Sequence, residues 1–278
     1  DKKSLFRFHE LPYGIRELVK NKCMNSKGKT LYDYIPKFKK YNGNEEALDK
    51  KDDDVNKKDS NELEGEDVDV ETTPSPSKDS DKLFNKDIKF SFYSKSKDAK
   101  PGKGNRETIP EKDMKRFEEL DKIKDWRRTL SNFAIAPFEL GENKDGEKYK
   151  WNSVEHYYQG NKYRTTTKLF EMFSLNSKSE LSKDPKLAKR AGGKGSTSKK
   201  YRKELGFKDA LLEDTFFKSK NDEKIMEDAQ RAKYEQNTDA KKVLLLTNDA
   251  LLEHIVARKK EGVVFYDTMR IRKELSKK

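Results

Sequence analysis

The 278-residue chain is poor in cysteine, histidine and apolar residues. Its one cysteine, Cys23, excludes an intramolecular disulfide and fits a reducing compartment. The three histidines are scattered, so we expect no metal site and no other cofactor. The longest apolar runs, such as residues 243–246, are far too short to span a bilayer, and the N-terminus lacks the apolar segment of a secretory signal. We therefore expect an intracellular, cytoplasmic protein with no membrane partner, and the nucleus is an alternative location.

Charge is abundant instead. Charged residues make up 41% of the chain and apolar residues only 32%, so part of it lacks the apolar surface needed to fold. The net charge is +12 and the isoelectric point is near 9.3. This balance favours phosphates, nucleotides or nucleic acid as partners. A lysine-rich composition with no functional basic face explains it equally well.

Composition divides the chain into three parts. Residues 1–42 are basic and rich in aromatics, and their role is open: they dock on the main domain, bind a partner or belong to a truncated module. Residues 43–83 are dominated by Asp, Glu, Lys, Ser and Asn, which is typical of a disordered acidic linker. Residues 84–278 carry clustered aromatics and read as the folded domain. Because the chain begins at Asp1 rather than at methionine, we expect a fragment or a processed chain.

The folded part is predicted to be a single, mostly helical α+β domain with a few short strands. Strands are expected at residues 88–93, 133–138 and 148–151. Helices are expected at residues 112–122, 153–163, 168–173, 185–190, 222–236 and 239–246, followed by a strand or helix pair over residues 263–275.

The helix that follows Ser153, a natural N-cap, carries an unusual polar strip. Positions three, four and seven residues apart share a helix face, which groups Glu155, Tyr158, Gln159 and Lys162. Glu155 and Lys162 are separated by about 20° around the axis and about 10 Å along it, so their long side chains can meet. Spacing alone is equally typical of a solvated ion pair, but the aromatic neighbours favour a packed helix.

These residues belong to a longer ordered pattern that resembles the NADAR, or YbiA-like, family. The resemblance covers roughly residues 87–276. Its motifs, in chain order, are Phe92-Tyr93-Ser94, Leu130-Ser131-Asn132-Phe133, Phe138, Trp151-x-Ser153-x-Glu155-His156-Tyr157-Tyr158-Gln159-x-x-Lys162, Ala191-Gly192-Gly193-Lys194, Met226-x-x-Ala229-x-x-Ala232-Lys233-Tyr234-x-Gln236-Asn237, Leu244-Leu245-x-Thr247 and Met269-x-Ile271-Arg272.

The resemblance implies hydrolysis of an N-glycosidic bond between a ribose carbon and a base nitrogen. The implied substrates are ADP-ribose attached to guanine, in DNA or nucleotides, or phosphoribosyl-pyrimidine intermediates of riboflavin synthesis. Glu155 and Lys162 take the place of the catalytic pair. The expected partner is thus a small molecule or nucleic acid that bears ribose phosphate or ADP-ribose; the oligomeric state stays open.

The chemistry of such a pair can be argued from the residues. Cleavage leaves positive charge on the ribose, which a carboxylate stabilises while it moves a proton. A neutral lysine can form a Schiff base with the opened sugar, but a neighbouring carboxylate favours the protonated amine. That route therefore needs desolvation or a nearby cation such as Lys233. In the simpler route Lys162 acts as a cation and Glu155 activates water; the sequence leaves both open.

Further residues are expected to bind the substrate. Gly192, Gly193 and Lys194 are expected to contact a phosphate, although a helix C-cap explains the glycines too. The remaining candidates are an amide for ribose hydroxyls, aromatic side chains for a base, and neighbouring polar groups: Asn132, Phe133, Trp151, Ser153, Tyr158, Gln159, Phe217 and Lys233. Turn formation is the alternative for Asn132, and core packing is the alternative for each aromatic.

Two segments depart from the family pattern. Many members have an Asp-Trp pair before the helix that contains Met226, whereas residues 213–217 read Glu-Asp-Thr-Phe-Phe, so Phe217 is expected to take the aromatic role. Many members also have a later Asp-x-x-Trp-Gly segment, which residues 253–266 lack. A helpful acidic residue is therefore missing, and a catalytically inactive binder of ADP-ribose or nucleotide is an alternative. A purely nucleic-acid-binding role is a third hypothesis, based on charge.

Overall fold

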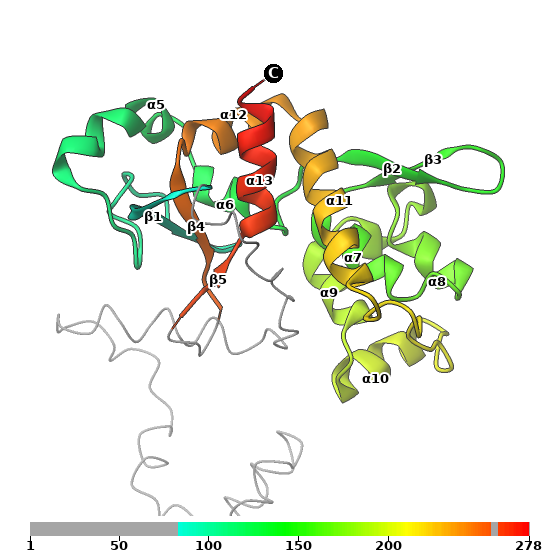
Figure 1. Cartoon of the computed structure of the whole chain (residues 1–278). Coiled ribbons are helices and arrows are strands. Elements are labelled where there is room, and N and C mark those ends of the chain that lie inside the picture. Colours follow the sequence, from blue (N-terminus) through cyan, green and yellow to red (C-terminus); the bar gives the residue numbers. More distant parts are fainter. Residues whose placement is uncertain (1–82, 257–260, 278) are drawn as a thin grey trace, which may run out of the picture. The chain divides into compact units, whose positions relative to one another are not determined.

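A computed structural model describes residues 83–256 and 261–277 (Figure 1). The predicted segment 1–42 and the predicted linker, as far as residue 82, lie outside the described residues, so the three-part domain division stays a prediction. The described residues all belong to one compact unit of the chain. Among the helices in these two ranges, none is long and apolar enough to cross a bilayer.

Short strands alternate with many helices, which confirms the predicted α+β class. The strands are β1 (Asn85–Phe92), β2 (Phe138–Glu142), β3 (Lys148–Trp151), β4 (Ala250–His254) and β5 (Val263–Val264). The α-helices are α5 (Glu118–Asp121), α6 (Trp126–Leu130), α7 (Val154–Asn161), α8 (Thr167–Met172), α9 (Pro185–Gly192), α10 (Ser196–Glu204), α11 (Asn221–Gln236), α12 (Thr238–Leu246) and α13 (Tyr266–Leu275). Short 3-10 helices are η3 (Glu111–Phe117), η4 (Leu175–Ser177) and η5 (Glu180–Ser182).

The first hydrophobic core surrounds a three-stranded sheet of order β1-β4-β5. Strand β1 runs parallel to β4, with Phe90 opposite Leu252, and β4 runs antiparallel to β5. Alternate residues of β1, namely Ile88, Phe90 and Phe92, are fully buried and pack with apolar residues of α6, α12 and α13. The two-residue period of these apolar residues makes this strand predictable from sequence.

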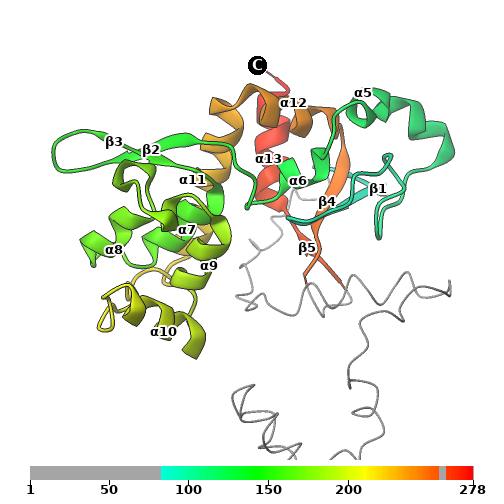
Figure 2. The ribbon, with the colours of Figure 1, turned by 180° about the vertical axis from the view of Figure 1, so that it is seen from behind.

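The second core lies between the antiparallel β2–β3 hairpin and helices α7, α8 and α9. Helix α11 joins the two cores: Met226 and Ala229 belong to the second, whereas Tyr234, two turns on, belongs to the first. Figures 1 and 2 show α11 between the α7–α9 group and α13. This helix therefore sets the position of α7, which carries the predicted catalytic pair.

Several predicted elements differ in the structure. The strand predicted over residues 133–138 is wrong in its position, because β2 begins at Phe138 and Ile135, upstream of it, is 57% exposed. The predicted helix at residues 112–122 is a 3-10 turn, η3, followed by the short α5. Five elements had no counterpart in the prediction, namely α6, α10, β4 and the 3-10 helices η4 and η5. Helix α10 contains a single large apolar side chain, Tyr201, so its sequence lacks the usual periodic signal.

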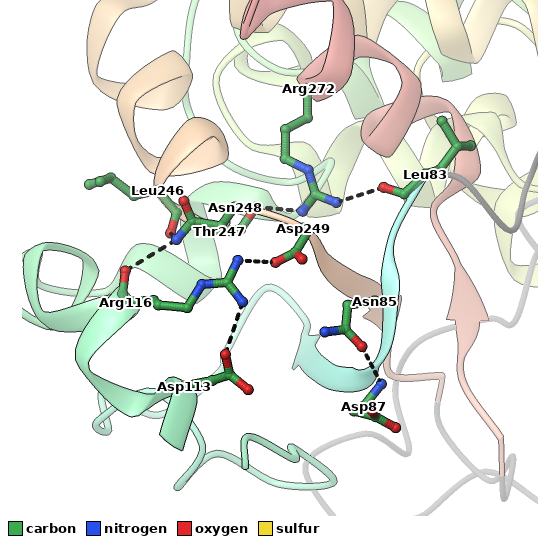
Figure 3. A network of polar contacts seen from close by, with 10 residues as sticks. All are labelled: Leu83, Asn85, Asp87, Asp113, Arg116, Leu246, Thr247, Asn248, Asp249 and Arg272. Carbon is green, nitrogen blue, oxygen red and sulfur yellow. Dashed lines mark hydrogen bonds and ion pairs between the residues drawn. The ribbon is translucent and has the colours of Figure 1, made fainter. Parts of the chain in front are cut away.

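A polar network ties the turn after α12 to the start of β1 and to η3 (Figure 3). Arg272 of α13 donates to Thr247 Oγ1 at 2.8 Å and to the carbonyl of Leu83 at 3.3 Å. Arg116 pairs with Asp113 and with Asp249. Burial lowers the pKa of Arg272 to about 10, and the nearby Asp249 opposes that shift. Thr247 and Arg272, which belong to the family-like motifs, therefore have structural roles here.

Candidate active site

Helix α7 is buried along its whole length, from Val154 to Asn161. The predicted N-cap is confirmed: Ser153 Oγ accepts from the main-chain N–H of His156 at 3.4 Å and lies 2.7 Å from His156 Nδ1. Burial lowers the pKa of His156 to about 4, so the imidazole is neutral at physiological pH. Ser153 itself is fully buried, and its side chain acts on the helix end. A substrate contact by Ser153 stays a prediction.

The predicted polar strip lies on one buried face of α7 and its C-cap. Glu155, Gln159 and Lys162 are 1%, 2% and 1% exposed. Gln159 Nε2 donates to Glu155 Oε1 at 2.8 Å, which holds the carboxylate in one orientation. Lys162 Nζ lies 5.0 Å from the centre of the Tyr158 ring, within the range of a cation–π interaction. The structure thus brings a buried carboxylate, an amide, a phenol and a lysine amine together on α7 and its C-cap.

Two glycines let α9 approach this strip. A methyl group on Gly192 would lie 2.0 Å from Gln159 Oε1, so only glycine permits this contact between α9 and α7. The Gly193 N–H is used within the helix end, where it donates to the carbonyl of Lys189 at 3.0 Å. The carbonyls of Ala191 and Gly193 accept from the buried Arg202 guanidinium at 2.5 and 2.7 Å. Close packing therefore accounts for both glycines, and the predicted phosphate contact depends on Lys194.

Lys194 and Phe217, both predicted to bind substrate, lie side by side. Lys194 Nζ is 3.5 Å from the centre of the Phe217 ring, and Phe217 is 41% exposed. Phe217 packs edge-on against the buried Phe216, which packs edge-on against Tyr158 of α7. A row of aromatic contacts thus connects the exposed pair to the ring beneath Lys162. The sequence prediction missed Phe216, although its position beside Phe217 was the available signal.

Asn132 and Phe133 reach the same helix from the turn after α6. The carbonyl of Asn132 accepts from the N–H of Glu155 at 3.0 Å, which satisfies a main-chain donor in the first turn of α7. The Asn132 side chain is 3% exposed, and its Oδ1 accepts from Gln230 Nε2 of α11 at 3.3 Å. Phe133 is half-buried, with Lys189 Nζ 5.3 Å from its ring centre.

Two further predicted site residues, Trp151 and Lys233, donate hydrogen bonds to main-chain carbonyls. Trp151 is fully buried and donates its indole N–H to the carbonyl of Leu140 at 2.9 Å, which is the core-packing alternative. Lys233 Nζ donates to the carbonyls of Thr129 and Ser131 at 2.7 and 2.9 Å. Burial lowers the pKa of Lys233 to about 7. Lys233 therefore supports the turn that carries Asn132, and a substrate contact by either residue stays a prediction.

The sequence prediction also missed supports of the site that lie far away in the chain. Gln230 Oε1 accepts from Thr268 Oγ1 of α13 at 2.9 Å, so a buried relay runs from α13 through α11 to Asn132. Arg202 stands in a run of lysines and gives no sequence signal of burial. In the segment that departs from the family pattern, Glu253 of β4 pairs with Lys89 and lies 3.4 Å from Ser91 Oγ.

Comparisons with known proteins give a family match. The family model described as the NADAR domain matches residues 120–260, just over half of the chain. The NMR structure of the Escherichia coli protein YbiA is similar at 24% identity, over 54% of this chain and 79% of that chain, with a TM-score of 0.37. No curated protein matches the chain. The matched range contains α7 with both predicted catalytic residues and the Gly192–Lys194 segment, and the chain belongs to the NADAR family.

Proposed function

We propose that this protein hydrolyses the N-glycosidic bond of a ribose-phosphate or ADP-ribose adduct, with Glu155 and Lys162 as the catalytic pair. The observation that carries the proposal is the buried Glu155 carboxylate, which the Gln159 amide orients on the face that also holds Lys162. Burying a carboxylate and a lysine on one helix is costly in desolvation, and such groups are often retained because they have a function. N-glycoside hydrolysis requires such groups.

In the proposed reaction the bond between ribose C1 and the base nitrogen breaks, and its electron pair goes to the nitrogen. The ribose becomes an oxocarbenium-like cation, which the Glu155 carboxylate stabilises. Glu155 then accepts a proton from the attacking water, whose oxygen bonds to C1. That proton is passed to the base nitrogen, so the products are a free ribose hydroxyl and a protonated base.

Lys162 acts in this scheme as a cation. Its Nζ lies 5.0 Å from the centre of the Tyr158 ring, an arrangement that suits a cation–π interaction. A charged Lys162 can bind a substrate phosphate or polarise the leaving base, whereas a Schiff base needs the neutral amine. Reduction with borohydride during turnover distinguishes the two routes. A covalent adduct on Lys162, seen by mass spectrometry, would support the Schiff base.

Two cation–aromatic pairs beside the strip, one exposed and one half-buried, supply the binding contacts. Phe217 offers a ring face for a base, and Lys194 at its side offers a cation for a phosphate. Phe133 with Lys189 forms a second pair of the same kind, next to the turn that holds Asn132. An ADP-ribosyl group carries one base and two phosphates, so both pairs have chemically suitable partners in it.

The test is incubation with a guanine-ADP-ribosylated oligonucleotide and, separately, with a phosphoribosylamino-pyrimidine. Release of ADP-ribose or ribose phosphate is read by mass spectrometry. Glu155→Gln and Lys162→Met are each expected to slow release by about 10²–10⁴-fold, the usual contribution of an acid–base group. Glu171→Gln, a change at an exposed carboxylate of α8, is the matched control and is expected to keep the wild-type rate.

Thermal melting separates loss of chemistry from loss of folding. A folded Glu155→Gln protein that hydrolyses either substrate at the wild-type rate would overturn the proposal. If the wild type binds ADP-ribose in a calorimeter but hydrolyses neither adduct, the protein is a binding module. The absence of the family's later acidic segment favours that second reading.

A further inference from the structure

Helices α9 and α10 carry an acid-free run of cations. Residues 185–203 contain no Asp or Glu, although the whole chain has 51 acidic and 63 basic residues. The cations of this run are Lys186, Lys189, Arg190, Lys194, Lys199, Lys200, Arg202 and Lys203. In α11, by contrast, acidic and basic residues are mixed. The local excess of positive charge is therefore a property of this helix pair and not only of the composition.

Most of these cations face solvent. Arg202 is buried and holds the end of α9, whereas Lys199, Lys200 and Lys203 are exposed on α10. Positions 199 and 203 are four residues apart, and positions 200 and 203 three apart, so the three lysines form one patch. Within residues 83–256 and 261–277, none of the three forms an ion pair with a carboxylate. Figures 1 and 2 show α10 beside the end of α9.

The same surface continues to the candidate active site. Arg190 of α9 stacks over the Tyr201 ring of α10 at 4.3 Å, which joins the two helices on their solvent side. Lys194, in the turn between them, lies over Phe217. A chain of cations thus leads from α10 to the exposed aromatic side chain that the proposed function assigns to the base.

We propose that the solvent-facing cations of α9 and α10 bind the phosphate backbone of a polynucleotide. A nine-residue helix is about 13.5 Å long, and one nucleic-acid strand carries a phosphate per about 3.4 Å of axis, so α10 matches about four phosphates. The three exposed lysines of α10, which form no ion pair with a carboxylate of the described residues, suit such a repeating anion. The proposed polynucleotide binding is argued from this surface alone. Its link to catalysis rests on the proposed function, and the hydrolysed adduct would then be attached to a nucleic acid.

A membrane surface fits the helix pair less well. A helix that lies on a bilayer buries a broad apolar face of Trp, Phe or Leu. Helix α10 has no such face, because Tyr201 is its single large apolar residue and is half-buried in the protein. Charge without an exposed apolar face is typical of backbone binding, which is electrostatic and salt-dependent.

The experiment measures anisotropy of labelled 20-nucleotide single-stranded DNA and RNA between about 50 and 200 mM NaCl, the range over which phosphate contacts weaken most. The protein carries Glu155→Gln so that turnover does not intervene. The triple variant Lys199→Glu, Lys200→Glu, Lys203→Glu is expected to bind at least 10-fold more weakly at low salt. The slope of log affinity against log salt concentration should be smaller in magnitude by about 2, because each of the three lost phosphate contacts contributes about 0.7 to it.

The control variant makes the same change of net charge elsewhere. It carries Lys144→Glu, Lys148→Glu and Lys242→Glu, at exposed positions of the β2–β3 hairpin and of α12. We expect it to keep the wild-type slope. Equal losses in the two triple variants, or no binding by the wild type at low salt, would overturn the proposal. Binding to phosphatidylserine vesicles in place of DNA and RNA would overturn it too.

The outcomes separate this proposal from the proposed function. Binding that depends on the α10 lysines, in a protein that hydrolyses no adduct, supports the surface and removes the enzymatic role. Hydrolysis of a free nucleotide adduct, with no oligonucleotide binding, supports the enzymatic role and overturns the proposed polynucleotide surface.

Discussion

Replacement of Gly192 by alanine is expected to push α9 away from α7 and to loosen the orientation of Glu155. The added methyl group would lie 2.0 Å from Gln159 Oε1 and 2.6 Å from Gln159 Cβ. The Oε1 atom can move away, but Cβ is fixed to the α7 backbone, so the helices themselves must separate. Gln159 is also the residue that donates to Glu155 Oε1.

The expected loss of stability follows from two terms. Overpacking in a protein interior costs about 1–3 kcal/mol. Loss of the hydrogen bond to the Glu155 carboxylate costs about 1.5–3 kcal/mol. Separation of the helices relieves the overpacking but breaks the hydrogen bond, so the two costs do not add in full. We therefore expect a total loss of stability of about 3 kcal/mol. For a folded part of this size that corresponds to a fall in Tm of about 6–12 °C.

The assay is urea denaturation of the wild type, Gly192→Ala and the neighbouring Gly193→Ala. A methyl group on Gly193 would lie 2.3 Å from Ser198 Oγ, but the next side-chain atom is 3.3 Å away. Rotation of the Ser198 side chain about its Cα–Cβ bond moves Oγ away and relieves that contact. Gly193→Ala should therefore cost less than about 1 kcal/mol. Equal midpoints for the two variants would refute the argument that Gly192 is required by its contact with Gln159.

Two further predictions concern buried polar groups. Burial lowers the pKa of His156 to about 4 from about 6.5 in the unfolded chain, so the unfolded state binds the extra proton first and stability is lost as the pH falls from about 6.5 to 4. The expected loss in the free energy of unfolding is about 3 kcal/mol. In His156→Asn the free energy of unfolding, measured across the same pH range, should not show this loss. Parallel pH profiles for the two proteins would contradict the prediction. Thr268→Val leaves Gln230 Oε1 without its donor, which should cost about 1–3 kcal/mol in urea, while the exposed change Thr197→Val should cost almost nothing. An equal effect of the two threonine changes would show that the relay to Asn132 does not contribute.

Local pattern was enough to predict α7 and the polar strip that it carries. The Ser153 cap, the aromatic neighbours and the helical spacing of Glu155, Gln159 and Lys162 all lie within a dozen residues. The strand at β1 was equally predictable, because Ile88, Phe90 and Phe92 alternate with less buried residues. Elements without a local apolar period were missed. Helix α10 depends on Arg202, whose burial is created by the carbonyls of α9, and no sequence period reports that contact.

Sequence by itself thus determined the α+β class, the family-like order of motifs and the presence of a carboxylate and an amine on one helix face. Only the tertiary structure decided that this face is buried, that Gln159 orients Glu155, and that Gly192 is required by a contact 33 residues away in the chain. It also showed that Trp151 and Lys233 donate hydrogen bonds to main-chain carbonyls. The physical reason is that hydrophobic period and capping are properties of a short segment, whereas burial and hydrogen-bond partners depend on segments that meet only when the chain folds.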